Sequence, residues 1–116
     1  MITIADLVKE FDLEVFCGAD KLMTPVKGAY SSDLLSDVMG KAIEGDIWIT
    51  MQTHRNIIAV SSLKELAGIL VVNGGRPEPE TLSAADSEGV ILVGTKESAF
   101  TTCGKLYKIM ERNAVV

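Results

Sequence analysis

Three short apolar runs constrain the fold of this chain more than any other feature of its sequence. They are residues 46–50 (DIWIT), 68–73 (GILVVN) and 89–94 (GVILVG), with centres about 20–23 residues apart. None alternates apolar with polar residues, which is typical of strands buried on both faces of a parallel sheet. Each run is followed by a polar junction and a helical pattern, as in right-handed strand–helix–strand units. The pattern predicts an α/β fold, a three-layer sandwich with a mostly parallel sheet flanked by helices.

The first half of the chain adds further elements to this sheet. Thr3 and Asp6 form a capping-box pattern at the start of an amphipathic helix. The segments LEVFCG (13–18) and VKGAYSS (26–32) are expected to be extended. With 116 residues, 47% of them hydrophobic, the chain is long enough for one core, and we expect a single domain over residues 1–116.

Composition and charge exclude several classes of partner. The formal net charge is −5, and Lys and Arg are scattered without a basic run, so neither nucleic acid nor an anionic membrane surface is an expected partner. No apolar run approaches the roughly 20 residues that span a bilayer. The N-terminus lacks the basic start and apolar centre of a signal peptide. We therefore expect a cytoplasmic protein.

Four polar junctions are the candidate functional positions: residues 30–33, 51–56, 73–76 and 94–97. In open parallel sheets, ligands gather at the carboxyl ends of the strands, where helix N-termini offer free N–H groups. We therefore predict one shared pocket for a small anionic ligand, either a nucleotide or a phosphorylated metabolite. The alternative is that these residues are ordinary N-caps and turns. The candidate ligand-binding residues are Ser31, Ser32, Asp33, Thr53, His54, Asn73, Gly74, Gly75, Arg76, Thr95 and Lys96.

The junctions also predict where the helices start. We expect helices that begin after a Ser31 or Ser32 cap, at Thr53, at Pro77 and after a Thr95 cap. Asp33 lies just past its cap, where its carboxylate can hold a neighbouring loop by accepting backbone N–H bonds. His54, the only histidine, has no recognisable nucleophile or carboxylate partner, so a structural or ligand-contacting role is favoured over catalysis.

Motifs of catalysis and metal binding do not occur in this sequence. It has no GxSxG elbow, no complete GxxxxGK[ST] phosphate loop and no three-glycine dinucleotide fingerprint. Cys17 and Cys103 are far apart and lack the spacing of a zinc, CxxC or iron–sulfur site. We expect no catalytic residues, no metal and no cofactor, and therefore a protein that is not an enzyme.

Three segments together resemble the DRTGG domain family, which is related to the N-terminal domain of the HPr serine kinase/phosphorylase. They are VKGAYSSDLLSDVM (26–39), GDIWITMQTHRNIIAVSSLKELAGILVVNGGRPEPE (45–80) and GTKESAFTTCGKLY (94–107). The resemblance extends from about residue 3 to residue 110. The motif that names the family is degenerate, because Met23–Thr24 replaces Asp-Arg and residues 27–29 (KGA) replace Thr-Gly-Gly.

The resemblance implies an HPr-kinase-N-terminal-like fold and a regulatory or dimerising role. Such domains are attached to phosphate acetyltransferases and CBS-containing pyrophosphatases, and the kinase chemistry of the HPr kinase lies in a separate domain. A homodimer is therefore expected, in keeping with apolar residues left over from the core, such as Met39, Met51 and residues 114–116. The alternative is an accessory module, without a small ligand, for an enzyme such as an iron hydrogenase or an electron-transfer system.

Overall fold

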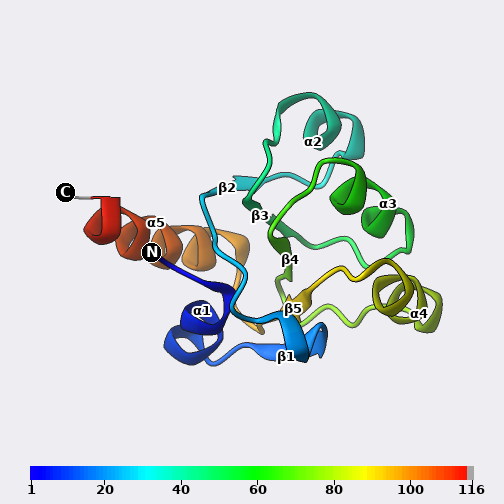
Figure 1. Ribbon diagram of the computed structural model, residues 1–116, viewed down its shortest axis with the longest axis horizontal. Helices are drawn as coiled ribbons and strands as arrows, with labels where there is room; N and C mark the ends of the chain where they lie inside the picture. The colour runs from blue at the N-terminus through cyan, green and yellow to red at the C-terminus, as the bar shows by residue number, and fades with distance from the viewer. Residues whose placement is uncertain (115–116) are drawn as a thin grey trace.

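A five-stranded sheet forms the centre of the molecule in this computed structural model, which describes residues 1–114 (Figure 1). The strand order is β1-β5-β4-β3-β2. Strands β2 to β5 run parallel to one another, and β1 pairs with β5 in the antiparallel direction. The strands are β1 (Glu14–Cys17), β2 (Gly28–Ser31), β3 (Asp46–Thr50), β4 (Gly68–Val71) and β5 (Leu92–Gly94).

Helices cover both faces of this sheet and complete three layers (Figure 1). One face packs against α1 and α5, and the other against α2, α3 and α4. The helices are α1 (Ile4–Phe11), α2 (Leu35–Lys41), α3 (Asn56–Leu63), α4 (Pro79–Glu88) and α5 (Ala99–Ala114), with a 3-10 turn at Ala19–Lys21. The predicted α/β sandwich with a mostly parallel sheet is confirmed.

Alternating side chains of the central strands fill two separate cores. In β3, Ile47 and Ile49 pack under α1 and α5, whereas Trp48 packs under α2 and α3 on the opposite face. Leu70 and Ile69 divide in the same way on β4. Both faces of the central strands are therefore apolar, which is why the sequence shows continuous apolar runs instead of alternation.

The helix starts differ from the sequence-based predictions, except at α1. The Thr3–Asp6 capping box is present as expected. Helix α2 begins at Leu35 and not directly after a Ser31 or Ser32 cap, and α3 begins at Asn56 and not at Thr53. Pro79, not Pro77, occupies the first turn of α4, and the hydroxyl that accepts an N–H bond at the start of α5 is that of Ser98, not Thr95.

Short side-chain turns accompany the later starts of α2, α3 and α5. The side chains of Ser32, His54 and Thr95 each accept a bond from the backbone N–H two residues ahead. Such bonds hold the chain in a turn and compete with helix formation.

Among residues 1–114, none of the helices is long and apolar enough to cross a membrane.

Candidate functional site

All four polar junctions lie at one edge of the sheet. Residues 30–33, 51–56, 73–76 and 94–97 follow β2, β3, β4 and β5, and these strands are parallel neighbours. The prediction that the junctions share the carboxyl edge is confirmed. They do not line one shared pocket, however: the β4 and β5 junctions line one hollow, and His54, Arg55 and Asn56 line a separate one at the start of α3.

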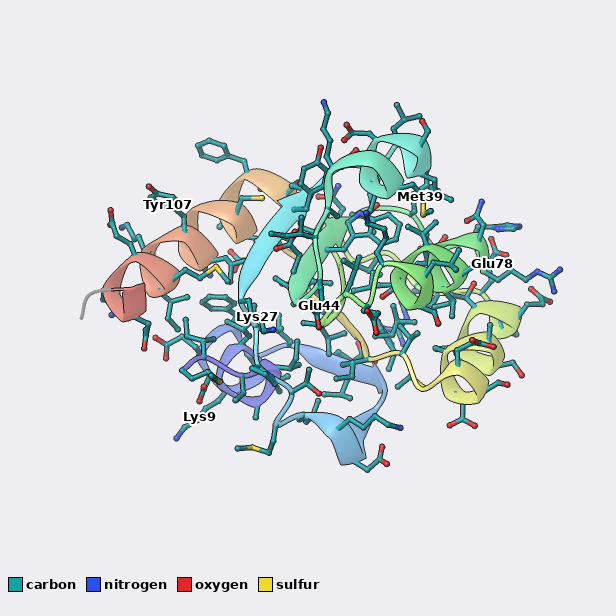
Figure 2. All side chains as sticks on the ribbon, turned by 45° about the horizontal axis from the view of Figure 1, so that its top comes forward. Lys9, Lys27, Met39, Glu44, Glu78 and Tyr107 are labelled. Carbon is teal, nitrogen blue, oxygen red and sulfur yellow. The ribbon has the colours of Figure 1, made fainter. Side chains whose placement is uncertain are left out.

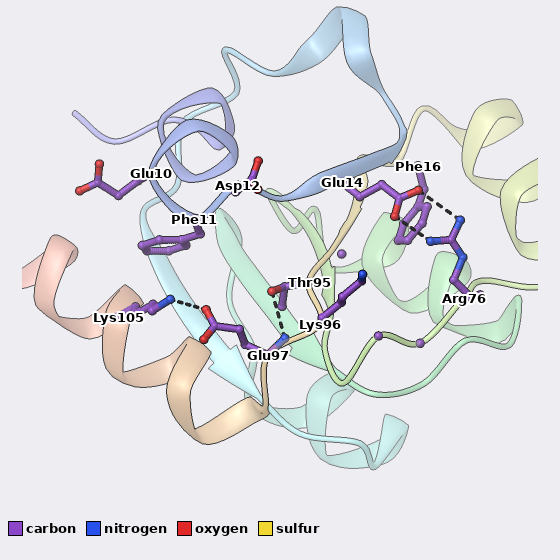
Figure 3. Close-up of a pocket in the computed structure, with 13 residues that line it drawn as sticks. Glu10, Phe11, Asp12, Glu14, Phe16, Arg76, Thr95, Lys96, Glu97 and Lys105 are labelled. Carbon is purple, nitrogen blue, oxygen red and sulfur yellow. Dashed lines mark hydrogen bonds and ion pairs between the residues drawn. The ribbon is translucent and has the colours of Figure 1, made fainter.

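The hollow is a pocket of about 640 Å³, which we call the β4/β5 pocket (Figure 3). This volume suits a small-molecule ligand. Of the predicted ligand-binding residues it contains Gly74, Gly75, Arg76, Thr95 and Lys96. Its other lining residues are Glu10, Phe11, Asp12, Glu14, Phe16, Gly94, Glu97 and Lys105.

One wall of the pocket depends on close approach between Gly94 and the Phe16 ring. A Cβ on Gly94 would overlap this ring and lie 2.8 Å from its Cζ. The ring belongs to β1, the antiparallel neighbour of β5. On the facing loop Gly74 adopts φ 69°, and a Cβ there would contact the Lys96 side chain, 3.9 Å from its Cγ. Close approach therefore requires glycine at position 94, whereas at position 74 the left-handed backbone favours it.

Arg76 is already engaged by two side chains of β1. Its guanidinium donates to both carboxylate oxygens of Glu14, at 2.7 and 3.1 Å, and lies 5.0 Å from the centroid of the Phe16 ring. The Glu14 carboxylate raises the pKa of Arg76 above its ordinary value. Bidentate pairing and stacking on a ring both suit a guanidinium. The positive charge of Arg76, one of the predicted ligand-binding residues, is therefore shared with a carboxylate.

Lys96 is the cation of this pocket that remains uncommitted. Lys105 donates to the Glu97 carboxylate at the opposite end (Figure 3). Lys96 lies between the two ion pairs and makes no ion pair or side-chain hydrogen bond within residues 1–114 (Figure 3). The pocket thus combines three cationic side chains and four carboxylates, and its only cation without a carboxylate partner in the described chain is Lys96.

Two backbone N–H groups of the β4 junction bond to carbonyl groups of the β5 junction. Asn73, which has φ 60°, donates to the Glu97 carbonyl at 2.8 Å, and Gly74 donates to the Thr95 carbonyl at 2.9 Å. The Glu97 N–H bonds to the Thr95 hydroxyl at 3.2 Å. These bonds join the β4 and β5 junctions into one rigid rim. The glycines therefore shape the loop and do not cradle an anion with their N–H groups.

Asp33 joins the β2 and β3 junctions, as predicted from its position. One carboxylate oxygen accepts bonds from the Thr50 hydroxyl at 2.7 Å and from the Met51 N–H at 2.8 Å. The Gln52 amide donates to the Asp33 carbonyl, and the Trp48 indole N–H donates to the Ser32 carbonyl at 2.8 Å. This half of the edge is closed by hydrogen bonds and holds its loops in place.

The remaining predicted residues lie outside the β4/β5 pocket. Ser31 borders an apolar groove between β2 and α5, and the Ser32 hydroxyl accepts the Leu34 N–H bond. The Thr53 carbonyl accepts a bond from the Thr81 hydroxyl at 2.7 Å, which ties the α3 junction to α4. His54 precedes α3, where its Nδ1 accepts the Asn56 N–H bond at 3.1 Å. Ser31 thus belongs to β2, the Ser32 and His54 side chains bond within turns, and His54 also lines a separate hollow beside α3.

Sequence reasoning missed the contribution of α1 and β1 to the pocket. Phe11, Asp12, Glu14 and Phe16 line it because β1 joins the sheet beside β5 in the antiparallel direction. Glu14 and Arg76 are 62 positions apart, and no local pattern connects them. The one available signal was the strand LEVFCG itself, whose place in the sheet the sequence did not reveal.

Among residues 1–114, no group of three or more His, Cys, Asp or Glu side chains lies close enough together to hold a metal ion. Cys17 and Cys103 are both free thiols, and burial is the main cause that raises the pKa of Cys17. The described part of the chain thus offers a charged pocket and no metal-ligand cluster.

Comparison with known proteins identifies the fold. No protein family model matches the sequence, and no curated protein matches it. One solved structure that it resembles is that of the CBS and DRTGG domains of the regulatory region of Clostridium perfringens pyrophosphatase, complexed with its activator, diadenosine tetraphosphate. The TM-score is 0.69 at 17% identity, over 87% of this chain and 44% of that one. The chain therefore spans less than half of that structure's length, and it has a DRTGG-like α/β sandwich fold.

Proposed function

We propose that this domain is a regulatory, non-catalytic module that binds a small ligand in the β4/β5 pocket, with an anionic group of the ligand on Lys96. The observation that carries the proposal is the uncommitted Lys96 in a 640 Å³ pocket at the carboxyl edge. This edge is where parallel α/β sheets bind ligands. A domain of the same fold occurs in the regulatory region of a pyrophosphatase that binds a nucleotide activator, which supports the regulatory role.

Nucleotides and phosphorylated metabolites are the first ligands to test. A ligand specific for the folded state raises its stability by RT ln(1 + [L]/Kd), so a thermal-shift panel detects it without an activity assay. We expect Lys96→Ala to abolish the shift. The matched control is Lys9→Ala, which removes an exposed lysine of α1 outside the pocket (Figure 2). A shift that survives Lys96→Ala, or no shift with any compound, would contradict the proposal.

A relationship to the N-terminal domain of the HPr serine kinase/phosphorylase, with a degenerate DRTGG motif at residues 23–29, is part of the same proposal. It is supported by the sequence resemblance and by the likeness of the fold to a structure that contains a DRTGG domain. On this proposal the domain transmits a ligand signal and performs no phosphoryl transfer. ATP hydrolysis by the purified chain that His54→Ala abolishes would contradict the non-catalytic role.

A second candidate role is assembly, with the expected homodimer as its simplest form. The apolar groove between β2 and α5 favours it, because β2 is an edge strand and Tyr107 projects from α5 with 69% of its surface exposed (Figure 2). Edge strands readily pair with another chain, and symmetric dimers are the commonest oligomers. Met39 and Met51 are also exposed, whereas residues 115–116 of the predicted apolar tail lie outside the described residues.

Light scattering tests the assembly role. We expect about twice the 12.4 kDa chain mass, and conversion to the monomer in Tyr107→Lys. A monomer at high protein concentration would contradict the homodimer. The remaining alternative is an accessory module for an enzyme such as an iron hydrogenase or an electron-transfer system, which predicts binding of that partner and a flat thermal-shift panel.

A further inference from the structure

The charges of the β4/β5 pocket restrict the ligand more sharply than its shape does. The two ion pairs at its ends, Arg76 with Glu14 and Lys105 with Glu97, each place a carboxylate beside a cation. Asp12 adds a further carboxylate to the lining. A ligand in this pocket therefore meets one uncommitted cation, Lys96, and several negative charges that are already in place (Figure 3).

Building on the proposed function, we infer that the pocket selects an organic monoanion with an apolar ring or chain, and that Glu14 and Glu97 exclude polyanions. A single carboxylate or phosphodiester group satisfies Lys96 without disturbing either ion pair. A phosphomonoester or polyphosphate brings further negative charge beside the Glu14 and Glu97 carboxylates. At separations of a few ångströms, like charges repel, and this repulsion weakens the binding of a polyanion relative to that of a monoanion.

The apolar part of the ligand has a matching surface. The Phe11 and Phe16 side chains are partly buried and line the pocket at its two ends: Phe11 packs with the core under α1 and α5, and Phe16 packs with the opposite core, beside Gly94. Aromatic rings provide area for stacking or edge contacts with a ring of the ligand. Pockets for small ligands typically combine such apolar walls with a few polar groups that fix orientation. Here Lys96 is the group that fixes the anionic end.

Glu14 is the residue that sets the charge preference at the β1 end. The pair with Arg76 is exposed, with side-chain exposures of 69% for Arg76 and 54% for Glu14. Exposed pairs are individually weak, so the pair does not hold β1 in place. Its effect on a ligand is nevertheless direct, because the Glu14 carboxylate occupies both donors that the guanidinium directs towards it. Removing the carboxylate gives a second anion-binding cation without changing the shape of the pocket.

The experiment measures affinity along a charge series with a constant ring system: adenosine, cyclic AMP, AMP and ATP. Phenylacetate is a second monoanion, so that a carboxylate is distinguished from a phosphodiester, and inorganic pyrophosphate is a polyanion without a ring. We expect wild-type protein to respond to at least one of the two monoanions, with at least tenfold weaker binding of AMP, ATP and pyrophosphate. Glu14→Gln is expected to raise the affinity for pyrophosphate about tenfold, as a charge-assisted bond to Arg76 becomes available.

Two controls assign the effect to the freed guanidinium. Glu44→Gln removes an exposed carboxylate from the loop before β3, at the amino edge of the sheet, and is expected to leave every affinity unchanged. The double variant Glu14→Gln/Arg76→Gln is expected to lose the gained pyrophosphate affinity. Unliganded melting of each variant separates these effects from altered folding.

The outcomes separate this inference from the proposed function. If AMP or ATP binds wild-type protein more tightly than cyclic AMP and phenylacetate, and Lys96→Ala abolishes that binding, the proposed site stands and the monoanion preference is wrong. An unchanged pyrophosphate affinity in Glu14→Gln also overturns the inference. If no compound binds either wild-type protein or Glu14→Gln, both proposals are contradicted.

Discussion

The carboxyl edge of the sheet has two halves that use similar residue types in opposite ways. At the β2/β3 half, the Asp33 carboxylate accepts bonds from Thr50 and Met51, and the loops close on each other. At the β4/β5 half, Asn73 and Gly74 also bond to the neighbouring junction, but the space beside them is a 640 Å³ pocket with the uncommitted Lys96. The difference teaches that polar residues at a strand end can be used up by bonds to each other, and that on the proposed function only a side chain without such a partner, here Lys96, is available to a ligand.

The largest effect that tests this comparison is expected at Trp48, on the closed half. Its side chain is fully buried, and its indole N–H bonds to the Ser32 carbonyl. We expect Trp48→Phe to lower the free energy of unfolding by about 3 kcal/mol, because it leaves a cavity and a carbonyl without its donor. Urea denaturation measures this loss. The exposed Tyr107→Phe is the control, with a change within about 0.5 kcal/mol, and a similarly small loss for Trp48→Phe would show that the closed half is not structural.

A smaller effect is expected at Gly94, which shapes the wall of the open half. Gly94→Ala places a Cβ against the Phe16 ring, and overpacking of this kind costs about 2 kcal/mol. Gly104→Ala in α5 is the matched control, because a Cβ there meets nothing within 4 Å and alanine favours a helix by up to about 1 kcal/mol. Thermal unfolding should therefore show opposite shifts for the two variants. Equal shifts would mean that the pocket wall does not depend on the bare Gly94 backbone.

The smallest expected effect is on the pH dependence of the free energy of unfolding, and it arises from Tyr30 and Asp37 in the closed half. The Tyr30 hydroxyl donates to the Asp37 carboxylate at 2.7 Å, and this bond lowers the pKa of Asp37 below its ordinary value of 3.8. A lowered pKa in the folded state contributes stability above pH 3.8, and the contribution is lost as the pH falls towards the folded-state value.

Tyr30→Phe should therefore make the free energy of unfolding less dependent on pH below about pH 5. Denaturation at a series of pH values measures the slope. Tyr107→Phe provides the control, because Tyr107 is exposed on α5. Identical slopes in wild type and Tyr30→Phe would show that the hydrogen bond does not couple to the Asp37 titration.

The sequence was sufficient to predict most of the fold. Residues 46–50, 68–73 and 89–94 contain the three central parallel strands because burial on both faces leaves continuous apolar runs. The role of Asp33 was also predictable, since an acid just past a strand end lies next to the neighbouring loop. The predicted starts of α2, α3 and α5 were wrong where the side chain of Ser32, His54 or Thr95 bonds to the N–H two positions ahead.

The candidate site was only partly predictable. Gly74, Gly75, Arg76, Thr95 and Lys96 do line one pocket, but its opposite wall comes from α1 and β1. That wall depends on β1 joining the sheet beside β5, a long-range pairing that leaves no periodic signal in the sequence. For the same reason the neutralisation of Arg76 by Glu14 was not predictable. Local patterns indicate which residues are polar, whereas topology decides which of them are already paired.

The most direct test of the central claim compares Asp33→Ala with Lys96→Ala in one pair of measurements, urea denaturation and ligand-induced thermal shift. The account predicts that Asp33→Ala lowers the free energy of unfolding by about 1–3 kcal/mol, because the Thr50 hydroxyl and the Met51 N–H lose their acceptor, and that it keeps the ligand shift. Lys96→Ala is predicted to change stability by less than about 0.5 kcal/mol and to lose the ligand shift. The reverse pattern, or a ligand shift that depends equally on both residues, would contradict the division of the edge into a structural half and a binding half.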